Sequence, residues 1–529
     1  MSSPSEEGGP DRLQFGVMTA RNTVGAAVQR LGYPHVADPW TRLVPLPALL
    51  EPRPGSLVVN ARTRIALVAP PADQPGNASG QGLGSDIRHL LTHLVGDLQQ
   101  VCGAHLEHTT APQRGDIVLR LDAAHDAHGP EGYSLTVGTD GAELCAATTH
   151  GLWNGSRTLL QLFTHEAGNG TLPCVHLVDR PRFESRGVML DVARHFFGVD
   201  HVMRFVELLA RFKINRLHLH LSDDQGWRLA IDGWPALTGV GASASVGGGT
   251  GGYFTRDDYI EIVAHAARHF ITIVPEIDMP GHTNAALSAV PELNLDGIAV
   301  LPYFGKGVGF SSLHLAAPAT ERFVRDVIAQ LAADTPGPWL HIGGDEANAT
   351  EHAEYAEFIA WVHGIVGEHG KQMIGWEEIA TTPLAPGAVV QHWLRSDVAA
   401  LAPADARFVM SPATRCYLDM RHTADCTVGR RWAGFIDVDT IYDWDPAVVI
   451  DGVGDDRILG VEAALWTERV PTFAEVEHLC FPRLVCLAEV GWTPQHLRDW
   501  PTFQPRLRVQ ADRLAASGVQ LYRSALLDG

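Results

Sequence analysis

One segment of the chain reads Trp339-Leu340-His341-Ile342-Gly343-Gly344-Asp345-Glu346-Ala347. An apolar run of the kind that forms a buried strand ends here in two glycines, and two adjacent carboxylates follow. A carboxylate pair by itself usually belongs to a solvated surface. At the carboxyl end of a buried strand, however, it lies where parallel α/β proteins place their functional groups. The segment therefore predicts a parallel strand whose end carries a general acid beside an orienting anion.

Similar strand-like runs lie on both sides of this segment, and amphipathic helices separate them. We expect eight strands, at residues 187–191, 216–221, 271–277, 340–343, 372–375, 388–392, 407–410 and 458–464. The expected helices cover residues 201–213, 255–270, 321–331 and 355–366, the second of which opens like a capping box. Alternating strands and helices are typical of parallel βα units. We therefore predict an α/β fold in which residues 183–529 form a (β/α)8 TIM barrel, the catalytic domain, with a C-terminal helix.

The chain before residue 183 has a different pattern. Residues 1–40 begin with a stretch rich in Ser, Glu, Gly and Pro and predict an N-terminal tail with an irregular lead-in. Within residues 41–182, strands are expected at 64–68 and 116–121, and helices at 87–101 and 149–163. This mixture predicts a small α+β domain. Since it offers no evident reacting group, we expect it to be non-catalytic and to pack against the barrel.

The composition excludes several classes of partner. Lys+Arg 40 against Asp+Glu 61 gives a net charge of −21, so neither a nucleic acid nor an anionic membrane is expected to bind. The N-terminus lacks the basic and apolar regions of a signal peptide, and no apolar run is long enough to cross a bilayer. The seven cysteines are odd in number and form no Cys-x-x-Cys, so neither a disulfide framework nor a zinc knuckle is indicated. We expect a cytoplasmic protein, with secretion as the alternative.

Polar and aromatic residues recur where the expected barrel strands end. They are Arg194, Asp223, Asp224, Asp278, His282, Asp345, Glu346, Trp376, Glu377, Trp393, Tyr417, Asp419, Trp466 and Glu468. The carboxyl ends of barrel strands share one mouth, so these side chains should converge. Aromatic rings pack against sugar rings, and charged groups bond sugar hydroxyls. The set therefore predicts a carbohydrate site.

Several segments resemble glycoside hydrolase family 20, the β-N-acetylhexosaminidases. The run at 341–347, HIGGDEA, resembles the family's catalytic signature. The stretches RGVMLDVARHFF (186–197), LHLHLSDDQGW (217–227) and PEIDMPGH (275–282) resemble its first three barrel strands. Tyr417-Leu418-Asp419 and Trp466-Thr467-Glu468 match the seventh and eighth. In the small domain, residues 132–135 and 151–155 resemble the family's preceding non-catalytic domain.

The resemblance implies an exo-acting, retaining β-N-acetylhexosaminidase that needs no metal or cofactor. Its substrate would be a small carbohydrate carrying a terminal, non-reducing β-linked N-acetylglucosamine or N-acetylgalactosamine. Most retaining glycosidases hold two carboxylates about 5 Å apart on opposite sides of the bond. Asp345 and Glu346 are sequence neighbours and poorly placed for that arrangement. In this family the 2-acetamido group of the substrate is the nucleophile instead, through an oxazolinium intermediate.

The same resemblance implies a role for each candidate residue. Glu346 would be the general acid and later the base for water. Asp345 would accept the acetamido N–H, and Tyr417 would donate to the acetamido oxygen. His282 and Asp223 would form a pair that orients Glu346. The remaining residues would bind the sugar: Trp376, Trp393 and Trp466 as pocket walls, and Arg194, Asp419 and Glu468 at its hydroxyls.

Two other functions are compatible with parts of the sequence. His218-x-His220 on one strand face, followed by Asp223, is compatible with a metal-dependent amidohydrolase. These histidines lie inside the expected strand and no further histidine evidently completes a site, so core histidines are the preferred interpretation. A catalytically silent carbohydrate-binding barrel is the second alternative, against which the joint presence of the acid pair, Tyr417 and the tryptophans argues. The resemblance also allows a homodimer.

Overall fold

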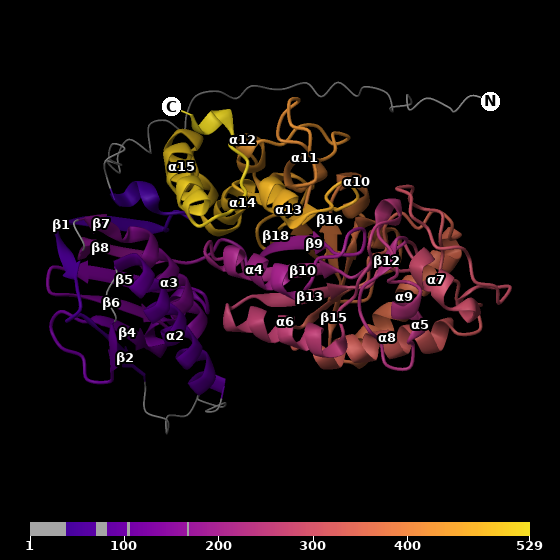
Figure 1. Ribbon diagram of the computed structural model, residues 1–529, viewed down its shortest axis with the longest axis horizontal. Coiled ribbons are helices and arrows are strands. Elements are labelled where there is room, and N and C mark those ends of the chain that lie inside the picture. The colour runs from indigo at the N-terminus through magenta and orange to yellow at the C-terminus, as the bar shows by residue number, and fades with distance from the viewer. Residues whose placement is uncertain (1–38, 70–81, 103–105, 167–168, 529) are drawn as a thin grey trace. The chain divides into compact units, whose positions relative to one another are not determined.

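The computed structural model describes residues 39–69, 82–102, 106–166 and 169–528. They form a small α+β domain followed by a closed barrel (Figure 1). The expected N-terminal tail falls outside the described residues except for its last two positions, where the short helix η2 (Pro39–Arg42) begins.

A closed ring of parallel strands forms the second part of the chain. In chain order the strands are β9 (Ser185–Asp191), β10 (Arg216–His220), β13 (Thr272–Glu276), β14 (Trp339–His341), β15 (Gln372–Trp376), β16 (Val389–His392), β17 (Arg407–Met410) and β18 (Ile458–Leu465). Each pairs in parallel with its neighbour, and β18 pairs with β9 to close the barrel. The predicted TIM barrel is confirmed, and each expected strand overlaps an observed one.

The barrel interior has an apolar layer below a polar one. The apolar layer is Val274, Trp339, Ile374, Val389, Val409 and Leu459. The polar layer lies two residues further along four of these strands and consists of Glu276, His341, Trp376 and Gln391. Because side chains alternate along a strand, these residues point into the barrel like the apolar layer. Trp376 Nε1 donates to Glu276 Oε1 at 2.9 Å, and Gln391 Nε2 donates to Glu462 Oε1 at 2.8 Å. The buried polar groups are therefore paired with one another beneath the strand ends.

Four of the longer helices overlap the predicted ones: α4 (Val199–Ala210), α6 (Arg256–Arg268), α8 (Thr320–Asp334) and α9 (His352–Glu368). The predicted C-terminal helix is α15 (Trp500–Ala516). Two further helices that were not predicted, α13 (Phe473–Cys480) and α14 (Arg483–Trp492), precede it. The capping box of α6 is confirmed. The Asp258 backbone N–H donates to Thr255 Oγ1 at 3.1 Å, and the Thr255 backbone N–H donates to Asp258 Oδ2 at 2.8 Å.

The connections after β15, β16 and β17 carry only short helices. They are η6 (Glu377–Thr381), α10 (Ser396–Ala399), α11 (Ala413–Cys416), α12 (Val438–Tyr442) and η7 (Pro446–Val448). Pro383 and Pro386 follow η6, and proline cannot continue a helix. The remaining short elements lie in barrel loops or at the C-terminus: β11 (Ser222–Asp223), β12 (Gly226–Trp227), α5 (Ala236–Gly239), η4 (Val246–Gly248), α7 (Asn284–Ala289), η5 (Pro291–Leu293), η8 (Gln495–Leu497) and η9 (Ala525–Leu527).

The small domain is one mixed sheet with two helices on one face (Figure 1). Its elements are β1 (Leu49–Val59), β2 (Arg64–Val68), α2 (Gly82–Cys102), β3 (Glu107–Thr109), β4 (Ile117–Leu121), η3 (Ala123–His128), β5 (Tyr133–Gly138), β6 (Gly141–Ala146), α3 (Thr149–Leu162), β7 (Thr164–Glu166) and β8 (Asn169–Asp179). A Cβ on Gly151 would lie 2.4 Å from the Gly132 carbonyl oxygen, and one on Gly155 would lie 2.2 Å from Leu144 Cδ1. These glycines let α3 approach the sheet closely.

Buried charged groups join this domain to the barrel. Lys213, just before β10, pairs with Asp179 at the end of β8 at 2.9 Å, and both side chains are fully buried. Trp492 Nε1 donates to the other Asp179 oxygen at 2.8 Å. Arg186 of β9 forms an ion pair with Glu131. The expected packing against the barrel is present.

Two further expectations concern membranes and cysteines. Among the described residues, no helix combines the length and the apolar character that crossing a membrane requires. Six cysteines, at positions 145, 174, 416, 426, 480 and 486, are buried and free of disulfide bonds. They act as small apolar core residues.

Candidate active site

The turn after β14 places the two signature carboxylates. Gly343 and Gly344 have φ of +68° and +92°, and Glu346 itself has φ of +45°. The Gly344 backbone N–H donates to Asp278 Oδ1 at 3.1 Å. A Cβ on Gly343 would lie only 1.8 Å from that same oxygen. Only glycine therefore fits beside Asp278, and the tight turn presents Asp345 and Glu346 together at the mouth of the barrel.

His282 lies between the signature carboxylates and Asp223. Its Nε2 is 3.5 Å from Glu346 Oε2 and 3.7 Å from Asp345 Oδ2, while its Nδ1 is 3.2 Å from Asp223 Oδ1. Burial opposes a charge on this imidazole, but Asp223, Asp278 and Asp345 outweigh it and hold the His282 pKa well above its usual value. The structure brings the expected Asp223–His282–Glu346 chain together.

Asp223 also binds Arg194, a link that the sequence did not predict. Arg194 Nη2 is 2.6 Å from Asp223 Oδ2, and both side chains are almost fully buried. Burial raises the pKa of Asp223, but Arg194 and His282 outweigh it and hold that pKa well below its usual range. The Arg194 guanidinium also lies over the Trp466 ring, 4.8 Å from its centroid. Asp223 therefore connects Arg194 on one side of the site to His282 on the other.

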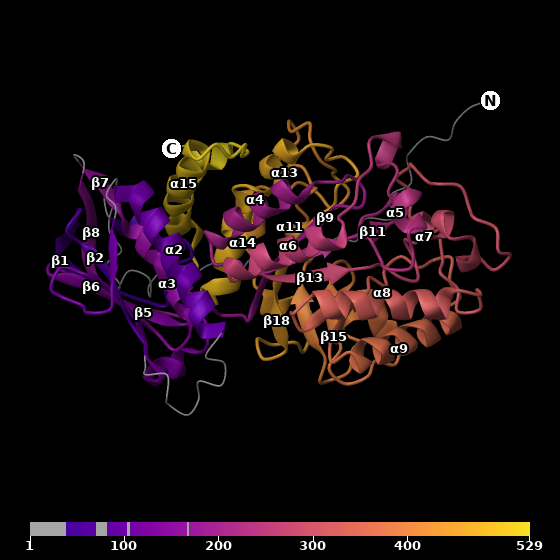
Figure 2. The same ribbon diagram turned by 60° about the horizontal axis from the view of Figure 1, so that its bottom comes forward.

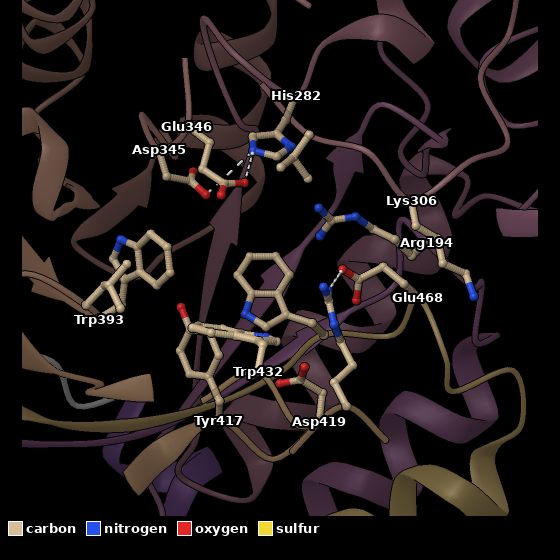
Figure 3. Close-up of a pocket in the computed structure, with 14 residues that line it drawn as sticks. Arg194, His282, Lys306, Asp345, Glu346, Trp393, Tyr417, Asp419, Trp432 and Glu468 are labelled. Carbon is tan, nitrogen blue, oxygen red and sulfur yellow. Dashed lines mark hydrogen bonds and ion pairs between the residues drawn. The ribbon is translucent and has the colours of Figure 1, made fainter. Parts of the chain in front are cut away.

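These side chains line a cavity of about 330 Å³. The lining consists of Arg194, His282, Lys306, Val308, Asp345, Glu346, Trp393, Leu394, Tyr417, Asp419, Arg430, Trp432, Trp466 and Glu468. Figure 3 shows His282, Asp345 and Glu346 gathered on one side, and Arg194, Lys306 and Glu468 on another. A ligand between them would present one end to the acid pair and the other to the charged cluster.

Aromatic rings form the rest of the wall. Trp393 and Tyr417 are stacked nearly parallel, with ring centroids 6.1 Å apart and an interplanar angle of 8°. Trp432 meets Tyr417 edge-on at 5.9 Å. Burial and, to a smaller extent, repulsion from Asp345 raise the pKa of Tyr417 well above its usual value. Tyr417 therefore keeps its hydroxyl proton and can donate it in a hydrogen bond.

Carboxylate oxygens in the cavity have no hydrogen-bond partner among the described residues. They are both oxygens of Asp419, Oε2 of Glu468 and Oδ1 of Asp345. Burial and repulsion from Glu468 raise the pKa of Asp419 well above its usual value, against the attraction of Arg430. A buried polar group without a partner destabilises the fold by about 1–3 kcal/mol. Ligand hydroxyl and N–H groups are the donors that would satisfy these oxygens.

Trp376 occupies a different place from the other predicted tryptophans. It is only 1% exposed, does not line the cavity, and belongs to the polar layer below. Its ring centroid lies 5.7 Å from that of Trp466. Trp376 therefore supports a wall residue from beneath. Asp223 likewise does not line the cavity and reaches it through Arg194 and His282.

The predicted core histidines are paired with carboxylates. His218 lies 2.9 Å from both Glu276 and Glu462, and His220 Nε2 lies 2.8 Å from Asp223. Burial lowers the pKa of His218, but the two glutamates outweigh it and raise that pKa to about 9. His341 joins them 3.0 Å from Glu276, a third histidine that the sequence interpretation did not count. Each of these imidazoles lies within 3.0 Å of a buried carboxylate, so the arrangement favours charge-paired core residues.

Four charged or aromatic residues in or near the cavity were not predicted. Trp432 and Arg430 lie in the loop at 421–444, whose conformation the sequence does not specify, and Lys306 lies in another long barrel loop. Arg430 Nη1 is 2.7 Å from Glu468 Oε1.

Glu378 Oε2 accepts a hydrogen bond from Trp393 Nε1 at 3.1 Å. Burial and, to a smaller extent, repulsion from Asp345 raise the pKa of Glu378 to about 8. For Glu378, the only signal in the sequence was its position next to Glu377, which follows a predicted barrel strand.

Comparison with known proteins identifies the family of both domains. The model of the catalytic domain of glycosyl hydrolase family 20 matches residues 183–361 and 348–495, and the model of that family's domain 2 matches residues 41–180. A β-N-acetylhexosaminidase of Cellulomonas fimi is 40% identical over 480 residues, covering 89% of this chain and 94% of the relative. A β-hexosaminidase of Porphyromonas gingivalis is 31% identical, covering 92% of this chain and 65% of the relative.

Solved structures give the same result. The Streptomyces plicatus N-acetyl-β-hexosaminidase in complex with Thio-NAglucal has a TM-score of 0.86 and 42% identity, covering 92% of this chain and 97% of that one. A mutant of the same enzyme in complex with product, GlcNAc, has a TM-score of 0.86 and 41% identity, covering 93% and 98%.

The barrel, its mouth and these matches define a glycoside hydrolase with a preceding small domain. The chain belongs to glycosyl hydrolase family 20. The expected activity, that of an exo-acting, retaining β-N-acetylhexosaminidase, is confirmed at the level of the enzyme class. The metal-dependent amidohydrolase and the silent binding barrel are not supported.

Proposed function

We propose that the cavity binds one terminal β-linked N-acetylhexosamine and that the residues around it perform the hydrolysis in the roles given below. The observation that carries this assignment is the pairing of Asp345 and Glu346 on one turn facing a single cavity. Its volume, about 330 Å³, lies at the small end of the range for ligand pockets and suits one sugar ring. Relatives solved with Thio-NAglucal and with GlcNAc support this substrate class.

Glu346 is assigned as the proton donor to the glycosidic oxygen. Its side chain is 33% exposed, more than that of Asp345, so it can reach a leaving group at the cavity entrance. The charged His282 beside it holds the carboxylate in position, and Asp223 in turn holds His282. After the leaving group departs, the same carboxylate accepts a proton from the attacking water.

Asp345 and Tyr417 are assigned to the 2-acetamido group. The free Asp345 Oδ1 accepts the acetamido N–H, while the Tyr417 hydroxyl donates to the acetamido oxygen. Held in this way, the acetamido oxygen attacks the anomeric carbon and forms the oxazolinium ring. A negative Asp345 stabilises the positive charge that develops on that ring.

Arg194, Asp419 and Glu468 are assigned to the hydroxyls at the non-reducing end. The unpartnered oxygens of Asp419 and Glu468 accept hydrogen bonds from the hydroxyl groups, and Arg194 donates hydrogen bonds to the hydroxyl oxygens. This cluster lies across the cavity from the acid pair (Figure 3). A sugar bound between the two has its anomeric carbon toward Glu346 and its far end against the charged cluster, which supports exo action.

The assignment is tested with matched aryl glycosides. The wild-type chain should hydrolyse an aryl β-N-acetylglucosaminide and leave the corresponding aryl β-glucoside essentially intact, since the latter lacks the nucleophile. Asp345→Asn and Tyr417→Phe should each lower kcat by about 10²-fold, the scale of losing one charge-stabilising contact. Comparable rates on both glycosides would rule out the acetamido group as the nucleophile.

A further inference from the structure

A cluster of histidines lies at the opposite end of the barrel from the active site. His265 is in the last turn of α6, and His269 caps that helix four residues later, just before β13. Glu207 lies on α4, which packs beside α6 (Figure 2). One ligand atom from each of these three side chains lies within 4.8 Å of the others. Histidines four residues apart on a helix present their rings on the same face.

The hydrogen bonds of His269 leave a nitrogen free. Its Nδ1 lies 2.9 Å from the His265 backbone carbonyl oxygen, which can only accept, so Nδ1 carries the proton. Nε2 is therefore the nitrogen with a lone pair. Metal-binding histidines are typically oriented in this way, with the second ring nitrogen donating to a carbonyl or carboxylate.

His265 offers a second nitrogen atom. Its Nε2 is buried, has no hydrogen-bond partner among the described residues, and lies 3.5 Å from Glu207 Oε1. Arg268 Nη2, which can only donate, is 3.4 Å from Nδ1 of the same ring. The neutral ring therefore carries its proton on Nε2, and a metal ion bound at Nε2 requires that proton to leave or to move to Nδ1. Arg268 opposes both this shift and the charge of a bound metal.

The small domain braces the cluster. The His93 ring on α2 packs against His269, with centroids 4.5 Å apart, and Trp153 on α3 meets His269 edge-on at 5.9 Å. Glu207 is 53% exposed, which leaves the cluster open to an ion from solvent.

We propose that Glu207, His265 and His269 bind one divalent transition-metal ion, with water completing the coordination. Two imidazoles and one carboxylate suit Zn²⁺, Ni²⁺ or Cu²⁺ rather than Mg²⁺ or Ca²⁺, which prefer all-oxygen sites. None of the three residues lines the active-site cavity. The ion would connect α4 to α6 beside the small domain and stabilise the folded chain, because it binds the native state.

The proposal is tested by titrating Zn²⁺ into the full-length chain after chelator treatment, with isothermal calorimetry and thermal unfolding. The wild type should bind one Zn²⁺ tightly and gain in Tm. Glu207→Gln and His269→Gln should weaken this binding by about 10-fold or more. Arg268→Gln should tighten it, because a like charge is removed, and Glu261→Gln, an exposed change on the same helix, should leave it unaltered. Because the Glu207 side chain is half-exposed, the Glu207→Gln variant should fold like the wild type.

Two further readouts separate this site from general histidine binding, since the chain holds 26 histidines. The electron paramagnetic resonance spectrum of bound Cu²⁺ should show two nitrogen ligands in the wild type and one in His269→Gln. Hydrolysis of the aryl β-N-acetylglucosaminide should be unaffected by removal of Zn²⁺. Equal Zn²⁺ affinity in the wild type and Glu207→Gln, or activity lost together with the metal, would overturn the proposal.

Discussion

Glu346 and Asp345 are neighbours in sequence but have different surroundings. Glu346 is partly exposed at the cavity entrance, whereas the Asp345 side chain is 10% exposed and lies among Asp278, Glu346 and His282. Burial raises the pKa of Asp345 to about 6, against the attraction of His282. An acid that faces the leaving group and a buried carboxylate that faces the acetamido group can thus share one turn.

The acid role of Glu346 predicts a dependence on the leaving group. Glu346→Gln should lower kcat/KM by about 10²–10⁴-fold for substrates whose leaving group must be protonated. With a strongly activated aryl leaving group the loss should be much smaller, since little protonation is needed. Steady-state rates on an alkyl and a dinitrophenyl N-acetylglucosaminide measure the difference, and equal losses on both would exclude the acid role.

The burial of Asp345 predicts a stability effect with a defined pH dependence. A carboxyl whose folded pKa is raised binds its proton more tightly when folded, so its ionisation destabilises the fold as the pH rises from about 4 to 6. At pH 7.5 this effect is complete and on the order of 1–3 kcal/mol. Asp345→Asn should therefore raise the free energy of unfolding at pH 7.5 and raise it less at pH 5.

Urea unfolding at the two pH values measures this effect. Asp425→Asn removes an exposed carboxylate and serves as the control, with little change expected at either pH. If Asp345→Asn had a lower free energy of unfolding than the wild type at pH 7.5, the prediction would be wrong, because the ionised carboxylate would then stabilise the free enzyme.

At the scale of elements, the turn after β14 depends on glycine for two reasons. Gly343 has a positive φ, and its missing side chain leaves room for Asp278. Gly343→Ala should shift the turn, displace Asp345 and Glu346, and lower kcat by about 10²-fold or more, because small misplacements near the reacting atoms are this costly.

Gly364→Ala is the matched control for this variant. Gly364 is an exposed position inside α9 with no atom within 4 Å of an added Cβ. The substitution should stabilise the helix by about 0.5–1 kcal/mol and leave kcat unchanged. Wild-type kcat in Gly343→Ala would show that the turn tolerates a side chain.

The elements differ in how well the sequence predicted them. The eight strands and the α6 capping box were predicted because apolar runs and local cap chemistry are encoded in adjacent residues. The connections after β15 to β17 were not, because short helices and irregular loops have no periodic signal. Trp432 reaches the cavity from such a loop, so only the fold places it beside Trp393 and Tyr417.

At the scale of the whole molecule, the site is assembled from strand ends far apart in the sequence. Arg194 follows β9, Asp223 follows β10 and Glu468 follows β18. Arg194 and Glu468 line the cavity, and Asp223 pairs with Arg194 from behind it. The candidate list could be predicted because barrels gather their strand ends at one mouth. The Arg194–Asp223 pair and the place of Trp376 below the cavity could not, because side-chain partners depend on the packed interior.

The central claim is that the acetamido group of the substrate, not a protein carboxylate, attacks the anomeric carbon. The inhibition constant of an N-acetylglucosamine thiazoline, which imitates the oxazolinium ring, tests this most directly when compared with that of N-acetylglucosamine. The account predicts that the thiazoline binds at least about 10²-fold more tightly than the product, as expected for a mimic of the high-energy state. Equal inhibition constants for the two compounds would contradict it.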